Sequence, residues 1–192
     1  MKTVLFSTAI LAVILSACGN NSNSSDQANK ASDTSKATTQ TSTTTNVEPA
    51  SIDEAVTAYL HVKNALTSDN GKEAAEAGKH LHEAMQKLDN ASFTADQKKA
   101  YDEVKDDIKE HAEHISTNAE KIAHQREHFD VLSKDMYDLI KSIKPSQTLY
   151  KDHCPMYNDN KGADWLSEVK EIKNPYLGKK MPNCGEVKEE IK

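Results

Sequence analysis

The chain has 192 residues and a formal net charge of −6 at pH 7. Lysine and glutamate alternate along it instead of gathering in basic runs, which argues against a nucleic-acid partner, because nucleic acids bind basic faces. Once the N-terminal segments are set aside, the remaining length suits one domain.

Residues 1–17 are predicted to form a lipoprotein signal peptide. Met1 and Lys2 precede an apolar run that ends at Leu15; this is the arrangement of a secretory signal, and it is too short to span a membrane. The sequence Leu-Ser-Ala-Cys-Gly that closes the run is typical of a bacterial lipobox. We therefore expect lipidation at Cys18 and a lipid-anchored protein of the bacterial cell envelope that faces the periplasm, in either the inner or the outer membrane. The alternative is an unmodified Cys18 beside an ordinary cleavage site.

Residues 18–50 are predicted to be the lipidated Cys18 followed by a disordered tether. Between Asn20 and Pro49 the chain is mostly Ser, Thr, Asn, Ala and Gln, with no aromatic residue, so it cannot bury enough apolar surface to offset the entropy of ordering. A flexible segment of roughly thirty residues reaches on the order of 30 Å. Such a tether would hold a domain off the membrane and leave it free to meet partners.

Residues 51–192 are expected to form a single domain, mainly α, built as an antiparallel four-helix bundle with a loop-rich C-terminal extension. Four stretches repeat apolar residues at intervals of three or four, near residues 52–67, 74–88, 95–115 and 122–143. Capping boxes are predicted where the first, third and fourth helices begin, at Ser51, Thr94 and Thr117. Pro145 ends the fourth helix. Short turns between the helices favour an up-and-down topology.

The extension differs from the helices in composition. From residue 146 on, it holds three of the five prolines, three of the six glycines and the only tryptophan. Residues 148–150 are predicted to start a strand that runs toward Cys154, residues 158–162 to form a turn, and residues 163–166 to return beside the strand as a short β-hairpin. We expect such a loop-rich segment to need a clasp.

Four sulfur residues of the extension form two pairs. Cys154 and Met156 are two apart and would point to the same side of an extended segment. Met181 and Cys184 are three apart and would lie together in a helical turn. Two thiolates and two thioethers are soft ligands that favour Cu(I) or Ag(I). Zinc is the alternative if histidine joins the set, although zinc rarely uses thioether ligands.

A disulfide between Cys154 and Cys184 is the competing interpretation. An exported protein meets thiol-oxidising conditions, and closing a loop of about thirty residues stabilises a fold by about 3 to 4 kcal/mol in the chain-entropy model. Met156 and Met181 would then be ordinary core residues. The spacing alone leaves both interpretations open.

Histidines recur in pairs on the third and fourth predicted helices. His111 and His114 are three apart, and His124 and His128 are four apart. The turn between the helices would bring the two pairs to one end of the bundle. These residues are feasible zinc or copper ligands, but the glutamates around them favour a solvated polar face.

Two further residues have alternative interpretations. Arg126 would either lie in an exposed, salt-bridged turn or brace a carboxylate or the extension. His153 beside Cys154 would suggest a cysteine nucleophile with its base, but neighbours in sequence seldom converge in space, and no motif for an oxyanion hole or an orienting group accompanies them. We therefore expect a protein that is not an enzyme.

The extension also forms a pattern, HCPMYNDNKGADWLS followed by EIKNPYLGKKM and CGEV, with AEHI and QREHFDVLSKDMYDLIK in the helices before it. This pattern resembles the family known as domain of unknown function 3347, over residues 51–191. Members occur in lipoproteins of the Bacteroidetes type and as domains fused to periplasmic adaptor subunits of copper and silver efflux systems. The resemblance implies a metal-related periplasmic role, with the four sulfur residues, His114 and Phe129 at characteristic positions of the family.

With the resemblance, metal handling becomes the leading expectation. We expect a membrane-anchored envelope protein that binds Cu(I), Ag(I) or a similar soft ion for buffering, chaperoning or efflux. The expected ligands are the thiolates of Cys154 and Cys184, the thioethers of Met156 and Met181, and an imidazole of His114. Efflux components are the expected protein partners. The alternative is a disulfide-stabilised, non-catalytic interaction module for an envelope or efflux partner, and a third possibility is a zinc site made by the four paired histidines.

Overall fold

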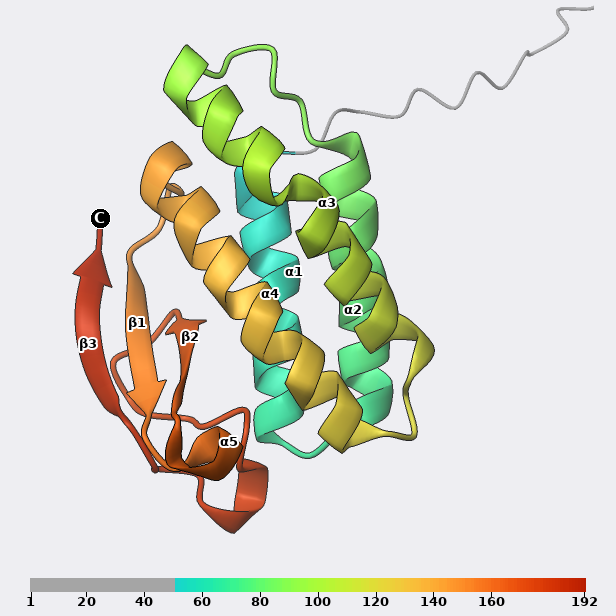
Figure 1. Cartoon of the computed structure of the whole chain (residues 1–192), viewed down its shortest axis with the longest axis vertical. Coiled ribbons are helices and arrows are strands. Elements are labelled where there is room, and N and C mark those ends of the chain that lie inside the picture. The colour runs from blue at the N-terminus through green and yellow to red at the C-terminus, as the bar shows by residue number, and fades with distance from the viewer. Residues whose placement is uncertain (1–50) are drawn as a thin grey trace, which may run out of the picture. The chain divides into compact units, whose positions relative to one another are not determined.

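Four helices packed side by side make up most of residues 51–192, the part of the chain that the structure, a computed structural model, describes (Figure 1). Each helix packs against the next one in the chain, and short connections reverse the chain direction. The predicted antiparallel four-helix bundle is confirmed. The predicted signal peptide, Cys18 and the predicted tether lie outside the described residues. The helices are α1 (Ile52–Thr67), α2 (Gly71–Lys87), α3 (Ala95–Thr117) and α4 (Ile122–Ile143).

Two of the three predicted helix starts are confirmed. The Ser51 hydroxyl accepts a hydrogen bond from the Glu54 backbone N–H, and the Glu54 carboxylate accepts one from the Ser51 N–H. Thr94 and Gln97 form the same reciprocal arrangement at the start of α3. Each box satisfies N–H donors that the first turn of a helix leaves unpaired.

The capping box predicted at Thr117 is wrong. Thr117 is the last residue of α3, and its hydroxyl donates a 3.0 Å hydrogen bond to the Glu113 carbonyl oxygen one turn earlier. α4 begins at Ile122 after Lys121, which makes no side-chain capping bond. Because the apolar face of α3 continues to the buried Ile115, packing carries this helix past the position where the local sequence favours a new cap.

Aromatic residues of α1 and α4 form the part of the core that lies beside the C-terminal extension. Tyr59 stacks on Phe129 with ring centroids 5.2 Å apart, and both are fully buried. The Tyr59 hydroxyl lies 2.8 Å from the Ser133 hydroxyl and accepts a 3.0 Å hydrogen bond from the Leu166 backbone N–H. One buried tyrosine therefore links α1, α4 and the extension.

A three-stranded antiparallel sheet follows the bundle, with strand order β2-β1-β3. β1 (Leu149–Cys154) pairs with β2 (Ala163–Ser167) and with β3 (Glu186–Ile191), and β2 packs on α4 and α1. The predicted hairpin of β1 and β2 is confirmed. The sequence does not predict β3, because this edge strand is mostly charged and exposed and buries only Ile191, so it lacks the alternation by which strands are identified.

The connection from β1 to β2 contains the short turn α5 (Tyr157–Asn160). Residues 158–160 all have positive φ, a conformation that Asn and Asp adopt more readily than most residues with a side chain. The turn is followed by Gly162, with φ of 81°, where a Cβ would lie 2.6 Å from the His153 ring. The predicted turn in this segment is confirmed.

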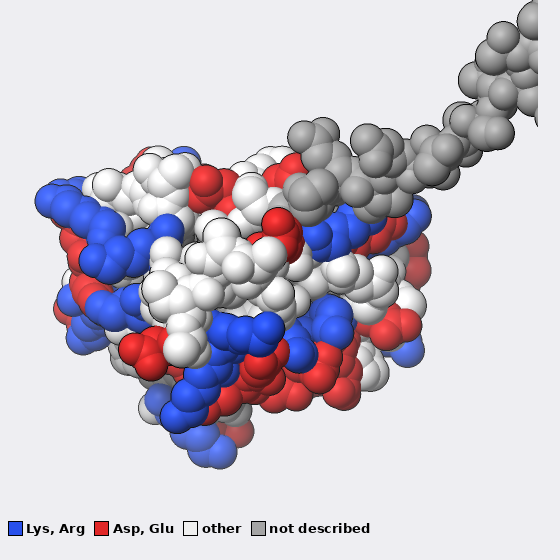
Figure 2. All heavy atoms as spheres, turned by 90° about the horizontal axis from the view of Figure 1, so that it is seen from above, with Lys and Arg blue, Asp and Glu red and all other residues white. Residues whose placement is uncertain are grey.

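Charges of both signs are interleaved on the surface. Figure 2 shows Lys and Arg side chains beside Asp and Glu side chains over the face seen from above the view of Figure 1. Opposite charges at such short separations cancel much of each other's field. No helix among residues 51–192 has the length and apolar character that crossing a membrane requires.

Candidate metal centres

The pairing of β1 with β3 brings the two cysteines of the extension together. Cys154 is the last residue of β1, and Cys184 lies two residues before β3, whose Glu186 pairs with His153. The two sulfur atoms are 3.2 Å apart, and both thiols are free. The Cys154 side chain is fully buried, whereas Cys184 is partly exposed. A ligand would therefore reach this cysteine pair from the Cys184 side.

The two methionines lie in turns next to the cysteine pair. The extended segment predicted for Cys154 and Met156 is wrong: β1 ends at Cys154, because Pro155 has no N–H with which to continue the ladder. Met156 is 49% exposed and has a helical backbone conformation, with φ of −94° and ψ of −14°. Met181 and Cys184 close a single turn, as predicted, with the Cys184 N–H donating to the Met181 carbonyl oxygen at 3.2 Å.

A buried asparagine, Asn174, holds the loop that carries Cys184. Its side-chain amide donates a 2.6 Å hydrogen bond to the Cys184 carbonyl oxygen, and its backbone N–H donates to the Pro182 carbonyl oxygen at 2.8 Å. Its side-chain oxygen accepts 2.8 Å hydrogen bonds from the backbone N–H groups of Tyr176 and Leu177. Asparagine before proline is a turn signal, but the sequence does not identify this clasp, because its partner lies ten residues away.

Gly185 allows the loop to pass close to Trp165. It has φ of 143°, and a Cβ at this position would lie 2.8 Å from the Trp165 ring and 2.9 Å from the His153 carbonyl oxygen. A residue with a side chain would clash at both places, so glycine is required. The tryptophan, which is almost fully buried, thus supports the backbone next to Cys184.

The Cys184 thiol keeps its proton at neutral pH. Burial and the neighbouring Cys154 thiol raise the pKa of Cys184. Because metal ions bind the thiolate form, binding at this pair would release protons. The pair is therefore suited to an ion with a strong preference for thiolate sulfur.

His153 lies on the other face of β1 from Cys154, because successive strand residues alternate. Its Nδ1 atom lies 2.6 Å from the Asp164 carboxylate on β2, which also pairs with the Lys151 ammonium at 2.9 Å. This histidine has a carboxylate partner instead of a thiol partner. The expectation that the protein is not an enzyme stays a prediction.

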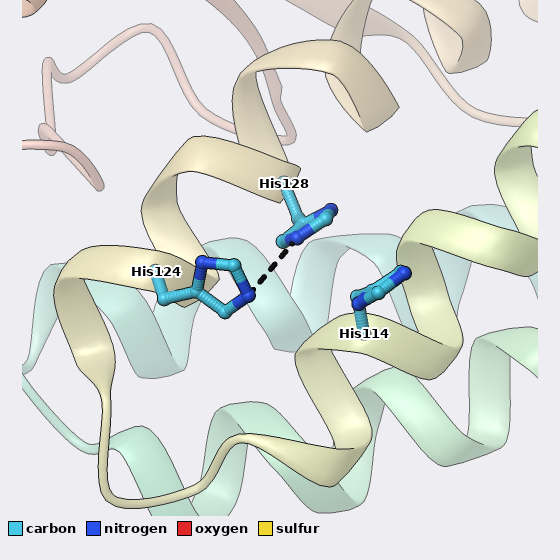
Figure 3. A group of neighbouring side chains, drawn as sticks. All are labelled: His114, His124 and His128. Atoms are coloured by element: carbon cyan, nitrogen blue, oxygen red, sulfur yellow. Dashed lines mark hydrogen bonds between the residues drawn. The ribbon is translucent and has the colours of Figure 1, made fainter.

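Four histidines of α3 and α4 meet in what we call the histidine cluster: His111, His114, His124 and His128, of which Figure 3 draws the last three. The Nδ1 atoms of His111 and His128 are 2.9 Å apart, and the Nε2 atoms of His124 and His128 are 3.2 Å apart. The His114 ring stacks on that of His128, with centroids 4.2 Å apart. Nitrogen atoms from His114, His124 and His128 all lie within 4.8 Å of one another. The two histidine pairs thus meet across the helices, as the sequence predicted.

Burial and neighbouring charges set the protonation of His111 and His128 in the histidine cluster. Burial, followed by repulsion from the neighbouring histidines, lowers the pKa of His128 to about 4, and burial lowers the pKa of His111. Both rings are therefore neutral at neutral pH, and each has one ring nitrogen that carries a lone pair and one that carries a hydrogen. The Glu127 carboxylate lies 3.1 Å from Nδ1 of His124, on the side of the ring away from the Nε2 that faces His128.

The two groups of candidate ligands belong to different parts of the fold. The sequence predicted that His114 joins the four sulfur residues, whereas the structure places His114 on α3 beside His124 and His128 of α4. The cysteine pair belongs to the sheet region, which contacts α4 through β2. The described residues thus offer a thiol pair and, separately, a set of imidazoles.

The only arginine in the sequence, Arg126, joins the bundle to the extension. Its Nη2 donates to the Leu66 carbonyl oxygen at 2.9 Å and to the Asp69 carboxylate at 2.5 Å, and its Nε donates to the Pro175 carbonyl oxygen at 2.8 Å. The hydrogen bond from Arg126 lowers the pKa of Asp69. The interpretation of Arg126 as a brace for a carboxylate and for the extension is confirmed.

Buried charges connect α1 to the sheet. Lys63 of α1 is fully buried, and its ammonium group lies 2.7 Å from the Glu168 carboxylate. Asp152 of β1 is fully buried as well, and neither of its carboxylate oxygens has a hydrogen-bond partner among the described residues. Burial raises the pKa of Asp152 to about 7, against the effect of Lys63. The sequence does not reveal this group, because Lys and Asp are usually exposed.

A known family covers the helical part of this fold. The family described as Protein of unknown function (DUF3347) matches residues 55–148. The chain belongs to the DUF3347 family. Comparisons with curated proteins and with solved structures found no match.

The DUF3347 match runs from α1 to the residue before β1. It includes the histidine cluster and Phe129, whereas Cys154 and Cys184 lie beyond its end. The resemblance described over residues 51–191 is therefore confirmed for the bundle, and the family attribution of the sulfur residues stays a prediction. A family of unknown function assigns no activity, so the function has to be argued from the chemistry of the sites.

Proposed function

We propose that this DUF3347 protein binds a soft metal ion, Cu(I) or Ag(I), through Cys154 and Cys184, and that it buffers the ion, passes it on or assists its efflux. One observation supports this proposal above the others. Two cysteines separated by 30 residues have their sulfur atoms 3.2 Å apart, with both thiols free and one of them partly exposed. Paired thiolates are the donors that soft ions prefer.

The cysteine pair needs little rearrangement to admit an ion. Metal–sulfur bonds of about 2.3 Å at tetrahedral angles separate two sulfur ligands by about 3.8 Å, which is close to the observed separation. The exposed Met156 follows in the adjacent turn and offers a thioether, and Met181 offers a second one from the Cys184 turn. A site of thiolate and thioether ligands favours reversible ligand exchange over catalysis.

The cell envelope is the proposed location. A lipid on Cys18 would hold the protein at a membrane facing the periplasm, where metal-efflux components are candidate partners. Metabolic labelling with a fatty acid tests the anchor: the full chain should incorporate the label, and Cys18→Ser should not. Label in the variant would contradict the proposed lipidation.

Competition for Cu(I) tests the metal-binding proposal. The reduced full chain should withdraw Cu(I) from a chelator of known affinity, and Cys154→Ser combined with Cys184→Ser should abolish this competition. Met156→Leu should weaken it, whereas Met136→Leu, a buried position in α4, serves as the matched control and should leave it unchanged. Undiminished competition by the double serine variant would exclude the cysteine pair as the site.

A disulfide-stabilised interaction module is the second candidate, and the same sulfur contact favours it. An oxidant of the cell envelope that takes two electrons, with release of the two thiol protons, would join the sulfur atoms by a bond of about 2.05 Å. This disulfide would hold the extension in place while the bundle binds an envelope or efflux partner. Intact mass measured with and without reductant separates the two candidates. A purified protein that is lighter than its reduced form by the mass of two hydrogen atoms, and inert to Cu(I) even after reduction, would support the module.

A further inference from the structure

We propose a second metal site, independent of the cysteine pair, in which His114, His124 and His128 bind one divalent ion of the Zn²⁺ or Cu²⁺ class between α3 and α4. Figure 3 shows these three side chains converging from the two helices. One nitrogen from each ring lies within 4.8 Å of the others. Imidazole nitrogen suits zinc, copper and nickel, whereas Ca²⁺ and Mg²⁺ prefer oxygen ligands.

The spacing of the nitrogens fits a tetrahedral ion. Zinc–nitrogen bonds of about 2.0 Å at tetrahedral angles place two nitrogen ligands about 3.3 Å apart. The Nε2 atoms of His124 and His128 are 3.2 Å apart, so these two nitrogens already have the separation of two ligands of one tetrahedral ion. The His114 ring stacks on His128 and is nearly parallel to it, and a rotation about its side-chain bonds would turn a nitrogen toward the ion.

Neighbouring groups already orient the ligands. Metal-binding histidines usually bond through one ring nitrogen while the other contacts a carboxylate or a similar partner. The Glu127 carboxylate lies 3.1 Å from Nδ1 of His124, which leaves Nε2 for the ion. Nδ1 of His128 lies 2.9 Å from Nδ1 of His111, so Nε2 of His128, which faces Nε2 of His124, is the nitrogen that would bind the ion. We therefore assign His111 as a positioning residue.

A second carboxylate supports the third ligand. Glu110 lies 3.8 Å from Nε2 of His114, one helical turn earlier on α3. Together with Glu127 it offers negative charge next to a dipositive ion without occupying the space between the rings. All four histidines are partly exposed, so an ion reaches them from solvent, and three protein ligands leave a fourth position for water or an exchange partner.

Zinc titration of a chain without the two cysteines tests the proposal. The full chain carrying Cys154→Ser and Cys184→Ser should bind one Zn²⁺, measured by calorimetry and by competition with a zinc chelator, and Zn²⁺ should raise its melting temperature. Adding His124→Asn and His128→Asn should weaken binding at least 100-fold and remove the thermal shift. Adding His111→Asn alone should weaken binding by about 10- to 100-fold at unchanged stoichiometry.

The matched control replaces two histidines elsewhere in the bundle. His61 of α1 and His80 of α2 are exposed, and His61→Asn with His80→Asn in the same background should leave zinc binding unchanged. Circular dichroism and melting without zinc establish that each variant is folded. Zinc binding that survives the substitutions at His124 and His128, or that is lost in the control, would overturn the proposal. Because both cysteines are absent throughout, failure of this site leaves the Cu(I) proposal intact.

Discussion

Asn174 and Cys184 are joined by a 2.6 Å hydrogen bond from a buried side-chain amide to a backbone carbonyl oxygen. The bond holds the Cys184 backbone but makes no contact with the thiol. The position of the loop is thus maintained while the sulfur atom stays free to move toward a ligand. This combination suits a site that has to accept and release an ion.

Asn174→Ala should destabilise the extension. The substitution removes three side-chain hydrogen bonds and leaves a buried backbone group of Tyr176 and partly buried ones of Cys184 and Leu177 without these partners. Unsatisfied buried groups cost about 1 to 3 kcal/mol each, so we expect the free energy of unfolding to fall by about 2 to 5 kcal/mol in urea denaturation. Lys161→Ala, at an exposed position in the neighbouring loop, is the control and should change it by less than about 0.5 kcal/mol. Equal effects of the two substitutions would contradict the role of Asn174 in holding the Cys184 loop.

Asp152 should make stability fall as the pH rises. Burial raises the pKa of this carboxyl group from 3.8 to about 7, so between these values the folded protein holds a proton that the unfolded chain has released. The free energy of unfolding therefore decreases as the pH rises through this range. Above about pH 7, where the buried Asp152 is ionised in the folded protein, the decrease is complete.

Asp152→Asn removes this titration. The stability of the variant relative to the wild type should be greater at pH 8 than at pH 5, by about 2 to 3 kcal/mol. Urea denaturation at the two pH values measures the difference, and Asp159→Asn in the exposed turn α5 is the control. A relative stability that does not change with pH would mean that Asp152 is already ionised in the folded protein at pH 5.

Arg126→Lys should loosen the junction between the bundle and the extension. A lysine ammonium cannot reproduce the fork that contacts Leu66, Asp69 and Pro175 together. We expect a loss of about 1 to 3 kcal/mol in the free energy of unfolding and faster hydrogen exchange in residues 175–180. Lys98→Arg, at an exposed position of α3, is the control for replacing one type of cationic side chain by the other. Unchanged hydrogen exchange in the extension would show that the contacts of Arg126 are not needed to hold it.

Oxidation should convert the cysteine pair from a metal site into a clasp. Closing the 30-residue loop between Cys154 and Cys184 should raise the free energy of unfolding by about 3 to 4 kcal/mol in the chain-entropy model and abolish competition for Cu(I). Thermal melting and chelator competition before and after mild oxidation measure both effects, and the double serine variant should respond in neither. Retained Cu(I) binding by the fully oxidised protein would locate the metal elsewhere.

The bundle was predictable because its signals are local. The three- and four-residue spacing of apolar residues and the boxes at Ser51 and Thr94 depend on neighbours within one or two turns. Local reasoning failed at Thr117, where packing of Ile115 extends α3. It also missed β3, whose charged sequence forms a strand only because β1 presents an edge to it.

The sequence allowed the types of ligand residue at the candidate sites to be predicted, but not which of these residues lie together in the fold. The spacing of sulfur and histidine residues identified both sets of candidate ligands. The contact between Cys154 and Cys184 depends on the register of β1 with β3, and the separation of His114 from the sulfur residues depends on which face of α3 meets α4. Asn174 and Asp152 acquire their roles only from burial and from distant partners, which no local pattern contains.

The direction of α1 places the candidate ligands at one end of the described fold and Ser51 at the other. The chain enters the described fold at Ser51, and α1, with 16 residues, carries it about 24 Å away from that point. α4 begins and β1 ends at that far end (Figure 1), so His124 and His128, in the first two turns of α4, and Cys154 share it. A partner that exchanged metal with the two proposed sites would therefore approach the end of the fold that lies away from Ser51.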